Sequence, residues 1–516
     1  MPQTLFPEPA QREMKRTTLF YIAILLCLLP VILLRDYTPS NELRYLSIAD
    51  EALRNHHFFT FTNHGAIYAD KPPLYLWLVM VARCCPLWSQ HLLLGLFSLV
   101  PAFLTTEVMA RLLRLKGSGL WLYRLLMTTS ALWLVSMLTL RMDMLMTLFI
   151  VLAIAEFHRL YSSGRPHESL LLPLWLFLAV FTKGGVGFIV PFSVIVVFLC
   201  VKGQGSNLFR FMGWKTWLML LLLFALWFGA VYAEGGSGYL YNLTIHQTVG
   251  RAFHSFHHRQ PFYYYLYMYW PLLMPWSLWS ALSLWRLWRS KSYGADSTRQ
   301  AIIAMMVIFV SLSLISSKLS IYLLPIVPFA MAIIPLSPQR EDWAARLSLA
   351  IPCSLLALTA PALLIAYHYW PTTKEIISLP LALAAVATSV SALAALALVA
   401  RRQVRRSAQT LAAGLLLTTF LSGWAMPRIN PLLGYGELCK ATSALLSAHP
   451  GYPLVAVDMK RAANVDVYLG RTPQILTREN LASLPHRAIV IIPQRDSSLV
   501  SLQERKSVGQ YLVGRK

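Results

Sequence analysis

The sequence predicts a polytopic α-helical membrane protein, and three features of its composition lead to this prediction. Of the 516 residues, 57% are hydrophobic and 13% are charged, and the mean hydropathy is +0.54. Soluble domains carry about 25% charged residues, so the composition excludes an ordinary soluble enzyme and a disordered chain. Lys and Arg number 45 against 22 Asp and Glu, a net charge of +23. These basic residues form short clusters between apolar runs, which indicates membrane topology and not nucleic-acid binding.

Residues 17–34 form the first apolar span and follow a cluster of basic residues. Such a start is also typical of a cleaved signal peptide. The span is followed by Arg35-Asp36-Tyr37, however, and not by the small residues of a cleavage site. We therefore expect a retained helix with its N-terminus in the cytoplasm.

Further apolar runs bring the predicted number of spans to thirteen. Several runs are shorter than the roughly 20 residues of a straight crossing, including the pair that meets at Lys183. The later spans are predicted near residues 89–113, 119–138, 142–161, 169–182, 184–202, 214–233, 264–288, 300–316, 320–337, 345–368, 378–400 and 407–427.

The distribution of charge supports this topology. With the N-terminus inside, alternation of the spans places nearly every dense basic cluster in the cytoplasm, as the positive-inside rule requires. The clusters are Arg111/Arg114/Lys116, Arg159/Arg165, Lys202/Arg210/Lys215, Arg286/Arg289/Lys291, Arg340/Arg346 and Arg401/Arg402/Arg405/Arg406. The opposite side then receives the segment 35–88, the loop 234–263, the tail 428–516 and three short turns.

The tail 428–516 has an ordinary composition and predicts a small α/β domain outside the membrane. Residues 454–457 and 488–492 are apolar runs of the length of buried strands, and 436–448 and 461–469 have helical spacing. The six cysteines of the chain show neither a disulfide framework nor a CxxC metal site.

The segment 35–88 contains two stretches, 45–53 and 74–82, that predict helices lying flat on the membrane surface. Simple interfacial packing and a functional role explain each of these helices equally well. Polar motifs flank both of them, at Asn41–Tyr45 and at Tyr68–Tyr75.

Three turns on the same side carry charges at membrane depth. Asp143, after Arg141, opens a helix with a carboxylate facing the outer side, either as a functional group or as a charge that the helix dipole stabilises. Lys183 and Lys318 lie in tight turns, where a lysine often reaches out to the interface. Together with Arg44 and Lys71, these cations form what a site for a membrane-embedded phosphate requires.

The loop 234–263 is rich in histidine and aromatic residues. Histidines bind metals when they converge with a carboxylate, although the spacing here is not a zinc motif and surface histidines are the more common outcome. The aromatic run 261–265 suits a membrane interface or sugar stacking equally. The polar residues of the loop are His246, Arg251, His254, His257 and His258.

Six motifs occur in order on one predicted side of the membrane. They are Asn41-Glu42-Leu43-Arg44-Tyr45, Tyr68-Ala69-Asp70-Lys71-Pro72-Pro73, Arg141-Met142-Asp143, Thr182-Lys183-Gly184, His258-Arg259-Gln260-Pro261-Phe262-Tyr263-Tyr264, and Ser317-Lys318 followed by Tyr322-Leu323-Leu324-Pro325. In their order the chain resembles, over its whole length, the GT-C glycosyltransferases of the protein-mannosyltransferase and lipid A 4-amino-4-deoxy-L-arabinose transferase superfamily.

The resemblance implies a GT-C fold with about 13 transmembrane helices in residues 1–427 and a periplasmic α/β domain in residues 428–516. The implied activity is transfer of a sugar from an undecaprenyl-phosphate donor to lipid A or another cell-envelope acceptor, on the periplasmic face of the bacterial inner membrane. The implied partners are the donor, the acceptor and membrane lipids, with no nucleic acid. Some members hold a divalent metal ion, and no organic cofactor is expected.

The resemblance also implies roles for single residues. Arg44, Lys71 and Tyr322 match positions that hold the carrier phosphate, and we add Lys183 and Lys318 as nearby cations. The cavity would be lined by Tyr45, Tyr68, Arg141 and Arg251. Asp70 and His258 match positions that hold a metal in some members.

One departure concerns the catalytic acid. The first motif of the family usually begins Asp-Glu, and its Asp is the favoured general base, but here that position is Asn41. An amide cannot take a proton, so Glu42 or Asp143 is expected to act as the base, with Asp36 a weaker candidate. Protein O-glycosylation, transport of polyprenyl-linked sugars, and binding without catalysis are the alternatives that the sequence leaves open.

Overall fold

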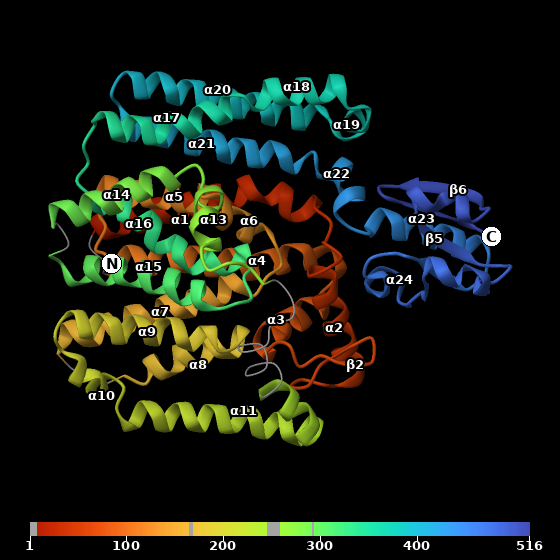
Figure 1. Cartoon of the computed structure of the whole chain (residues 1–516), viewed down its shortest axis with the longest axis horizontal. Helices are drawn as coiled ribbons and strands as arrows, with labels where there is room; N and C mark the ends of the chain where they lie inside the picture. Colours follow the sequence, from red (N-terminus) through yellow and green to blue (C-terminus); the bar gives the residue numbers. More distant parts are fainter. Residues whose placement is uncertain (1–7, 165–168, 245–258, 292–293) are drawn as a thin grey trace, which may run out of the picture.

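Backbone hydrogen bonding explains why the apolar runs form helices, because within a bilayer every N–H and C=O group must be paired inside the protein. The computed structural model describes residues 8–164, 169–244, 259–291 and 294–516. Most of its helices run roughly parallel in one large bundle, and a small sheet lies beyond one end of this bundle (Figure 1). The predicted polytopic helical architecture is therefore confirmed.

The first half of the bundle alternates long helices with short ones. Its helices are α1 (Glu8–Leu34), α2 (Glu42–Asn55), α3 (Pro73–Arg83), α4 (Leu87–Leu112), α5 (Gly117–Thr129), α6 (Ala131–Leu138), α7 (Asp143–Ser163), α8 (Leu171–Lys183), α9 (Val186–Val201), α10 (Leu208–Phe211) and α11 (Trp214–Tyr241). Two short strands, β1 (Thr62–Asn63) and β2 (Ala66–Ile67), pair as an antiparallel hairpin between α2 and α3.

The second half of the bundle leads from the described end of the histidine-rich loop to the C-terminal sheet. Its helices are α13 (Tyr264–Leu272), α14 (Ser277–Ser290), α15 (Asp296–Leu314), the 3₁₀-helix η3 (Ser320–Ile326), α16 (Val327–Leu336), α17 (Trp343–Ala357), α18 (Thr359–Tyr369), α19 (Pro371–Ile376), α20 (Leu379–Ala400), α21 (Val404–Gly423) and α22 (Met426–Leu433). Helices α17, α18, α20 and α21 form a separate layer along one side of the bundle (Figure 1).

Fewer helices meet the length and hydropathy of a membrane span than the sequence predicted. In the described part of the chain, seven helices are long and apolar enough to cross a membrane, or nine if each bent pair is one span. The bent pairs are α5 with α6, which meet at 63°, and α21 with α22, which meet at 74°. The remaining predicted spans form shorter helices, so the count of thirteen is not confirmed.

Helices α8 and α9 show how such short segments pack. With 13 residues, α8 is about 20 Å long at 1.5 Å per residue, which is less than the roughly 30 Å of a bilayer core. The chain reverses at Gly184, whose φ of +105° is readily adopted by glycine but rarely by other residues. At Gly187 an added Cβ would lie 2.4 Å from the backbone of Ala179. The two helices therefore touch closely and bring the end of α8 into the bundle.

The segment between α1 and α4 confirms the two helices predicted there, as α2 and α3. Helix α2 buries Leu43, Leu46 and Ala49 and packs against α3 and the first hairpin. Glu51 of α2 holds that hairpin by accepting hydrogen bonds from Thr62 Oγ1, His64 N and Gly65 N at 2.5 to 2.9 Å. This segment is thus a packed layer of the fold.

Residues 436–516, here named the C-terminal unit, form a five-stranded mixed sheet with one main helix. The strand order is β4-β3-β5-β7-β6, where β3 is parallel to β4 and β5, and β7 is antiparallel to β5 and β6. Its elements are α23 (Gly436–Ala448), β3 (Leu454–Val457), η4 (Ala462–Val465), α24 (Asp466–Leu469), β4 (Gln474–Leu476), β5 (Ile489–Pro493), β6 (Gln503–Val508) and β7 (Tyr511–Arg515). The predicted strands and the helix 436–448 are confirmed, whereas the hairpin of β6 and β7 was not predicted.

One apolar cluster joins the C-terminal unit to the bundle. It contains Leu43 and Leu46 of α2, Leu140 before α7, Leu438 of α23 and Ile491 of β5. Because burial of apolar surface is the main stabilising contribution in such contacts, the C-terminal unit rests against the segment that follows α1.

Candidate functional site

A buried carboxylate between two cations forms the centre of the candidate site. Asp143 is the first residue of α7 and is 2% exposed. Its Oδ2 atom lies 3.3 Å from Arg141 Nε, and its Oδ1 atom accepts a hydrogen bond from Lys183 Nζ at the end of α8. A carboxylate in the first turn of a helix is also favoured by the helix dipole. The structure therefore brings together two motifs that are 40 residues apart.

Lys183 links this centre to η3. Its Nζ atom lies 4.5 Å from the centroid of the Tyr322 ring, a cation–π distance. Helix α8 ends at Lys183 because the chain turns at Gly184. The sequence predicted both residues as phosphate contacts, and the structure places them side by side.

Arg44 lies on α2, beside Tyr45 and Tyr68. Its guanidinium carbon is 5.8 Å from the Tyr45 ring centroid and 5.7 Å from that of Tyr68. Its Nη2 atom donates to Asn41 Oδ1 at 3.3 Å, and its buried Nε has no hydrogen-bond partner among the described residues. Part of the hydrogen-bonding capacity of this guanidinium is thus open to a ligand.

Electrostatics connects Tyr45 with Asp143. Burial, and then the negative charge of Asp143, raise the pKa of Tyr45 to about 12. Tyr45 therefore stays protonated and lies within the electrostatic influence of Asp143 and Arg141. Arg141 and Lys183 are paired with Asp143, and Arg44 lies beside Tyr45 next to this centre. Such an excess of positive charge in a buried site favours an anion.

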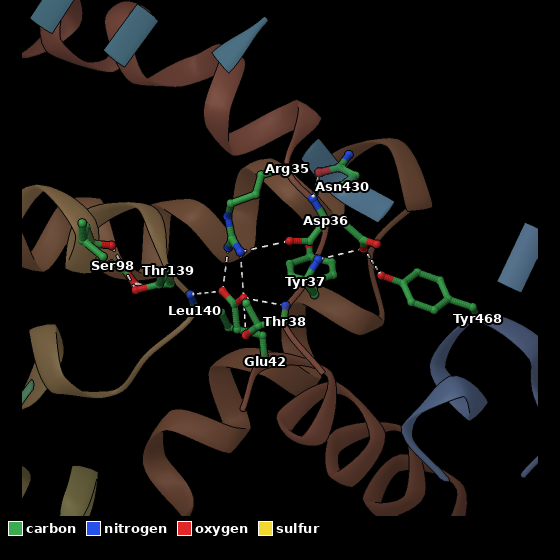
Figure 2. Close-up of polar contacts among 11 residues, drawn as sticks. Arg35, Asp36, Tyr37, Thr38, Glu42, Ser98, Thr139, Leu140, Asn430 and Tyr468 are labelled. Atoms are coloured by element: carbon green, nitrogen blue, oxygen red, sulfur yellow. Dashed lines mark hydrogen bonds and ion pairs between the residues drawn. The ribbon is translucent and has the colours of Figure 1, made fainter. Parts of the chain in front are cut away.

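Glu42 has a different environment, although it was predicted as a base. It is 1% exposed and accepts five hydrogen bonds, from Arg35 Nη1 and Nη2, Thr38 N and Oγ1, and Leu140 N, at 2.6 to 2.8 Å (Figure 2). Burial alone would raise the pKa of Glu42, but the Arg35 hydrogen bonds and charge and the two backbone N–H groups outweigh it and lower the pKa. Glu42 accepts five hydrogen bonds, whereas each oxygen of Asp143 contacts a single cation, so the geometry favours Asp143 over Glu42 as a proton acceptor.

Asp36, the weaker candidate, faces the C-terminal unit. Its carboxylate accepts hydrogen bonds from Tyr37 N at 2.8 Å and from the Tyr468 hydroxyl (Figure 2). It also accepts one from Gly436 N at 2.6 Å. Its own N–H donates to Asn430 Oδ1 at 2.9 Å. These contacts join two parts of the chain about 400 residues apart, so Asp36 has a docking role.

The remaining predicted residues lie in three places. Asp70 and Lys71 follow Tyr68 in the turn before α3 and are half-buried. Lys318 is 3% exposed and donates to the carbonyls of Gln260 and Ile315 at 3.1 and 2.6 Å, so it holds the turn after α15. Arg251 and His258 lie outside the described residues, as do the other histidines of their loop.

A metal site does not emerge from the residues that the structure describes. Within them, no group of three or more His, Cys, Asp or Glu side chains is placed to hold an ion. Among these residues, Asp70 is therefore not part of such a group.

Sequence reasoning missed the partners of Glu42. Arg35 directly follows α1, and Thr38 and Leu140 lie in segments without regular structure. A charged residue at the end of a membrane helix is common, and a backbone N–H carries no sequence signal. Only the tertiary contacts identify these residues.

The helical bundle and the C-terminal unit together have the fold of a membrane protein of known structure. A crystal structure of ArnT from Cupriavidus metallidurans bound to undecaprenyl phosphate has the same fold, with a TM-score of 0.77 over 96% of this chain and 97% of that chain, at 18% sequence identity. The GT-C fold predicted from the order of the motifs is therefore confirmed.

The chain is also similar in sequence to two known proteins. The chain is 24% identical over 79% of its length to the undecaprenyl phosphate-alpha-4-amino-4-deoxy-L-arabinose arabinosyl transferase of Shewanella sediminis (strain HAW-EB3), of which the match covers 76%. It is 26% identical over 69% of its length to an uncharacterized protein of Aquifex aeolicus (strain VF5), of which 72% is covered. No family model matches the chain.

Proposed function

We propose that this protein is a GT-C glycosyltransferase that moves a sugar from a polyprenyl-phosphate donor to a lipid A or other cell-envelope acceptor. The observation that carries the proposal is the convergence of Arg44, Arg141, Asp143, Lys183 and Tyr322 from four separate segments into one buried site. The likeness to an ArnT structure bound to undecaprenyl phosphate supports this class of donor.

The cations of the site bind the donor phosphate. Arg44 has a buried Nε without a partner among the described residues, and guanidinium groups match phosphate oxygens well. Lys183 adds a point charge, and Tyr322 holds its ammonium group in place. Because the phosphate group leaves with the polyprenyl chain, these charges stabilise the negative charge that develops on it in the transition state.

Asp143 is the proton acceptor in this proposal. While the site is empty, its carboxylate is paired with Lys183 and Arg141, which makes it a weak base. A bound phosphate competes for both cations and leaves Asp143 free to accept a proton. An acceptor phosphate in its monoanionic form then loses its remaining proton to Asp143. One of its oxygens bonds to C1 of the sugar, and the bond from C1 to the donor phosphate oxygen breaks.

Asn41 favours a phosphate acceptor. It stands where the family usually has Asp, and its amide oxygen contacts Arg44 at 3.3 Å without neutralising the charge. A phosphate acceptor is already largely ionised and needs less help from a base than a hydroxyl does. Lipid A carries such phosphates, so we propose it as the acceptor, with transfer on the periplasmic side and the N-terminus in the cytoplasm. Residues up to α22 then form the transmembrane part, and the C-terminal unit is periplasmic.

A transfer assay tests the proposal. Purified protein in detergent is mixed with lipid A and undecaprenyl-phosphate aminoarabinose labelled in the sugar, and label on lipid A is the expected result. The Asp143→Asn variant should lose transfer, whereas Asp50→Asn should keep it, because Asp50, in the second half of α2, is paired with Arg83 at the end of α3. In a second assay the protein is placed in vesicles. Movement of intact donor across the vesicle membrane, without cleavage, would instead indicate a transporter.

Mass spectrometry of envelope material identifies the acceptor. Lipid A from cells with and without the protein is compared, and an aminoarabinose adduct that depends on the protein is expected. Adducts on a protein, with lipid A unchanged, would contradict the lipid A acceptor and indicate O-glycosylation.

A further inference from the structure

The Thr139–Leu140 peptide group leads directly into the candidate site. It lies between α6 and α7, in extended backbone that begins at Thr139 with φ of −112° and ψ of 146°. Arg141 and Asp143 follow it within three residues. A peptide group outside helices has no helical partners for its N–H and C=O, so side chains must supply them if the group is to be held in one orientation.

Both poles of this peptide group are bound by buried side chains. The carbonyl of Thr139 accepts a hydrogen bond from Ser98 Oγ of α4 at 2.8 Å. The N–H of Leu140, on the other side of the same peptide plane, donates to Glu42 Oε1 at 2.7 Å. Because a peptide unit is planar and rigid, two opposed hydrogen bonds fix its orientation. Figure 2 shows Ser98 and Glu42 on either side of this peptide.

Glu42 is itself held rigidly. Arg35 makes two parallel hydrogen bonds to its carboxylate, at 2.6 and 2.7 Å, and Thr38 donates twice to Oε2 at 2.8 Å. The paired charge and the hydrogen bonds make burial of this carboxylate tolerable. Glu42 therefore transmits the position of α2, and of the segment after α1, to the turn that carries Arg141 and Asp143.

We infer that Glu42 is a positioning residue. Glu42 fixes the Thr139–Leu140 peptide from one side and Ser98 fixes it from the other, and together they set the placement of Arg141 and Asp143. This inference rests on the proposed function. It explains why a buried acid immediately after Asn41 is saturated with donors, and it separates the role of Glu42 from that of a base. A displacement of reacting groups by about 1 Å can cost 100-fold in rate, so the hold on this turn matters for catalysis.

Three variants test the inference from both poles. Glu42→Gln keeps the size of the side chain but has only one acceptor oxygen, so it cannot accept from both Leu140 and Thr38, and its NH₂ group faces a donor at the other position. Ser98→Ala removes the hydrogen bond at the opposite pole of the same peptide. Glu51→Gln is the matched control, because Glu51 lies on the same helix and also accepts three hydrogen bonds, all from the β1–β2 hairpin.

Hydrogen exchange of the turn gives the direct measurement, and it needs no substrate. In Glu42→Gln, we expect amide exchange in residues 139–143 to rise about tenfold, with a smaller rise in Ser98→Ala and none in Glu51→Gln. Unchanged exchange of this turn in Glu42→Gln would overturn the inference, whatever the transfer assay shows.

Transfer kinetics then test the catalytic consequence. For folded Glu42→Gln we expect kcat to fall by about 10- to 100-fold, with KM for the donor much less affected and the acidic limb of the pH profile retained. Loss of that limb would make Glu42 the base and contradict a positioning role. An unchanged kcat would also contradict a positioning role. If the wild-type protein transfers no sugar while the exchange result holds, the proposed function fails and the hold of Glu42 on the turn stands.

Discussion

Replacement of Asp36 by Asn should loosen the C-terminal unit from the bundle. Asp36 is 9% exposed, and its Oδ1 accepts from Tyr37 N and the Tyr468 hydroxyl, while Oδ2 accepts from Gly436 N. Burial and the negative charge of Asp36 raise the pKa of Tyr468, so this phenol stays protonated and donates. An Asn that keeps the Oδ1 contacts turns its NH₂ group toward the N–H of Gly436.

The size of the effect follows from these contacts. Glycine at 436 and 434 allows the close approach, since an added Cβ at Gly434 would lie 2.3 Å from Asp36 Oδ2. Loss of a hydrogen bond to a charged acceptor costs about 1.5–3 kcal/mol, and an unsatisfied buried donor costs about 1–3 kcal/mol. A loss of about 3 kcal/mol in docking free energy corresponds to an increase on the order of 100-fold in the open population.

Limited proteolysis of the α22–α23 connection measures that population when opening is fast relative to cleavage. The Asp36→Asn variant should be cut on the order of 100-fold faster than the wild type. Tyr468→Phe removes one donor only and should show a smaller increase. A cleavage rate of Asp36→Asn within twofold of the wild type, with intact bundle helices, would refute the docking role of this carboxylate.

Three further predictions concern charges. Asp143→Asn should lower kcat by about 100-fold, the lower end of the range for removal of a general base because a phosphate acceptor needs less help, with binding of undecaprenyl phosphate to the purified protein retained. Asn41→Asp should weaken donor binding, measured as a higher Kd for undecaprenyl phosphate, because a carboxylate there would neutralise Arg44; tighter binding would contradict the role of Arg44. The hydrogen bond with Asp466, at 3.3 Å, raises the pKa of His64 above its ordinary 6.5, although burial opposes this shift. The contact therefore stabilises docking fully below about pH 6.5. This stabilisation is lost as the pH rises through the pKa of His64 in the folded state. Proteolysis of the wild type should then be slower at pH 6 than at pH 8, and His64→Gln should abolish this difference.

Much of the fold could be predicted because membrane helices have a strong local signal. The apolar runs ending at Leu34, Leu112 and Ala400 became helices with nearly the predicted ends. The number of spans could not be predicted, because hydropathy alone does not show whether a short apolar helix such as α8 crosses the membrane. Their depth depends on packing, as the contact of Gly187 with Ala179 shows.

The candidate site was predictable only in part. Arg44, Asp143 and Lys183 stood out because charges are rare near apolar spans, and the structure places Asp143 in contact with Lys183. Glu42 has the same local signal as Asp143, since both are acids at the start of a helix. Its role as the acceptor of five hydrogen bonds depends on Arg35, Thr38 and Leu140, whose positions follow from the tertiary fold.

The sequence by itself determined that the chain is a helical membrane protein and which charged residues are available for chemistry, because hydropathy and charge are local properties of the chain. The tertiary structure alone decided that Asp143 faces cations while Glu42 and Asp36 hold segments together. The physical reason is that the behaviour of a buried carboxylate depends on the donors around it, and these come from segments up to 432 residues away.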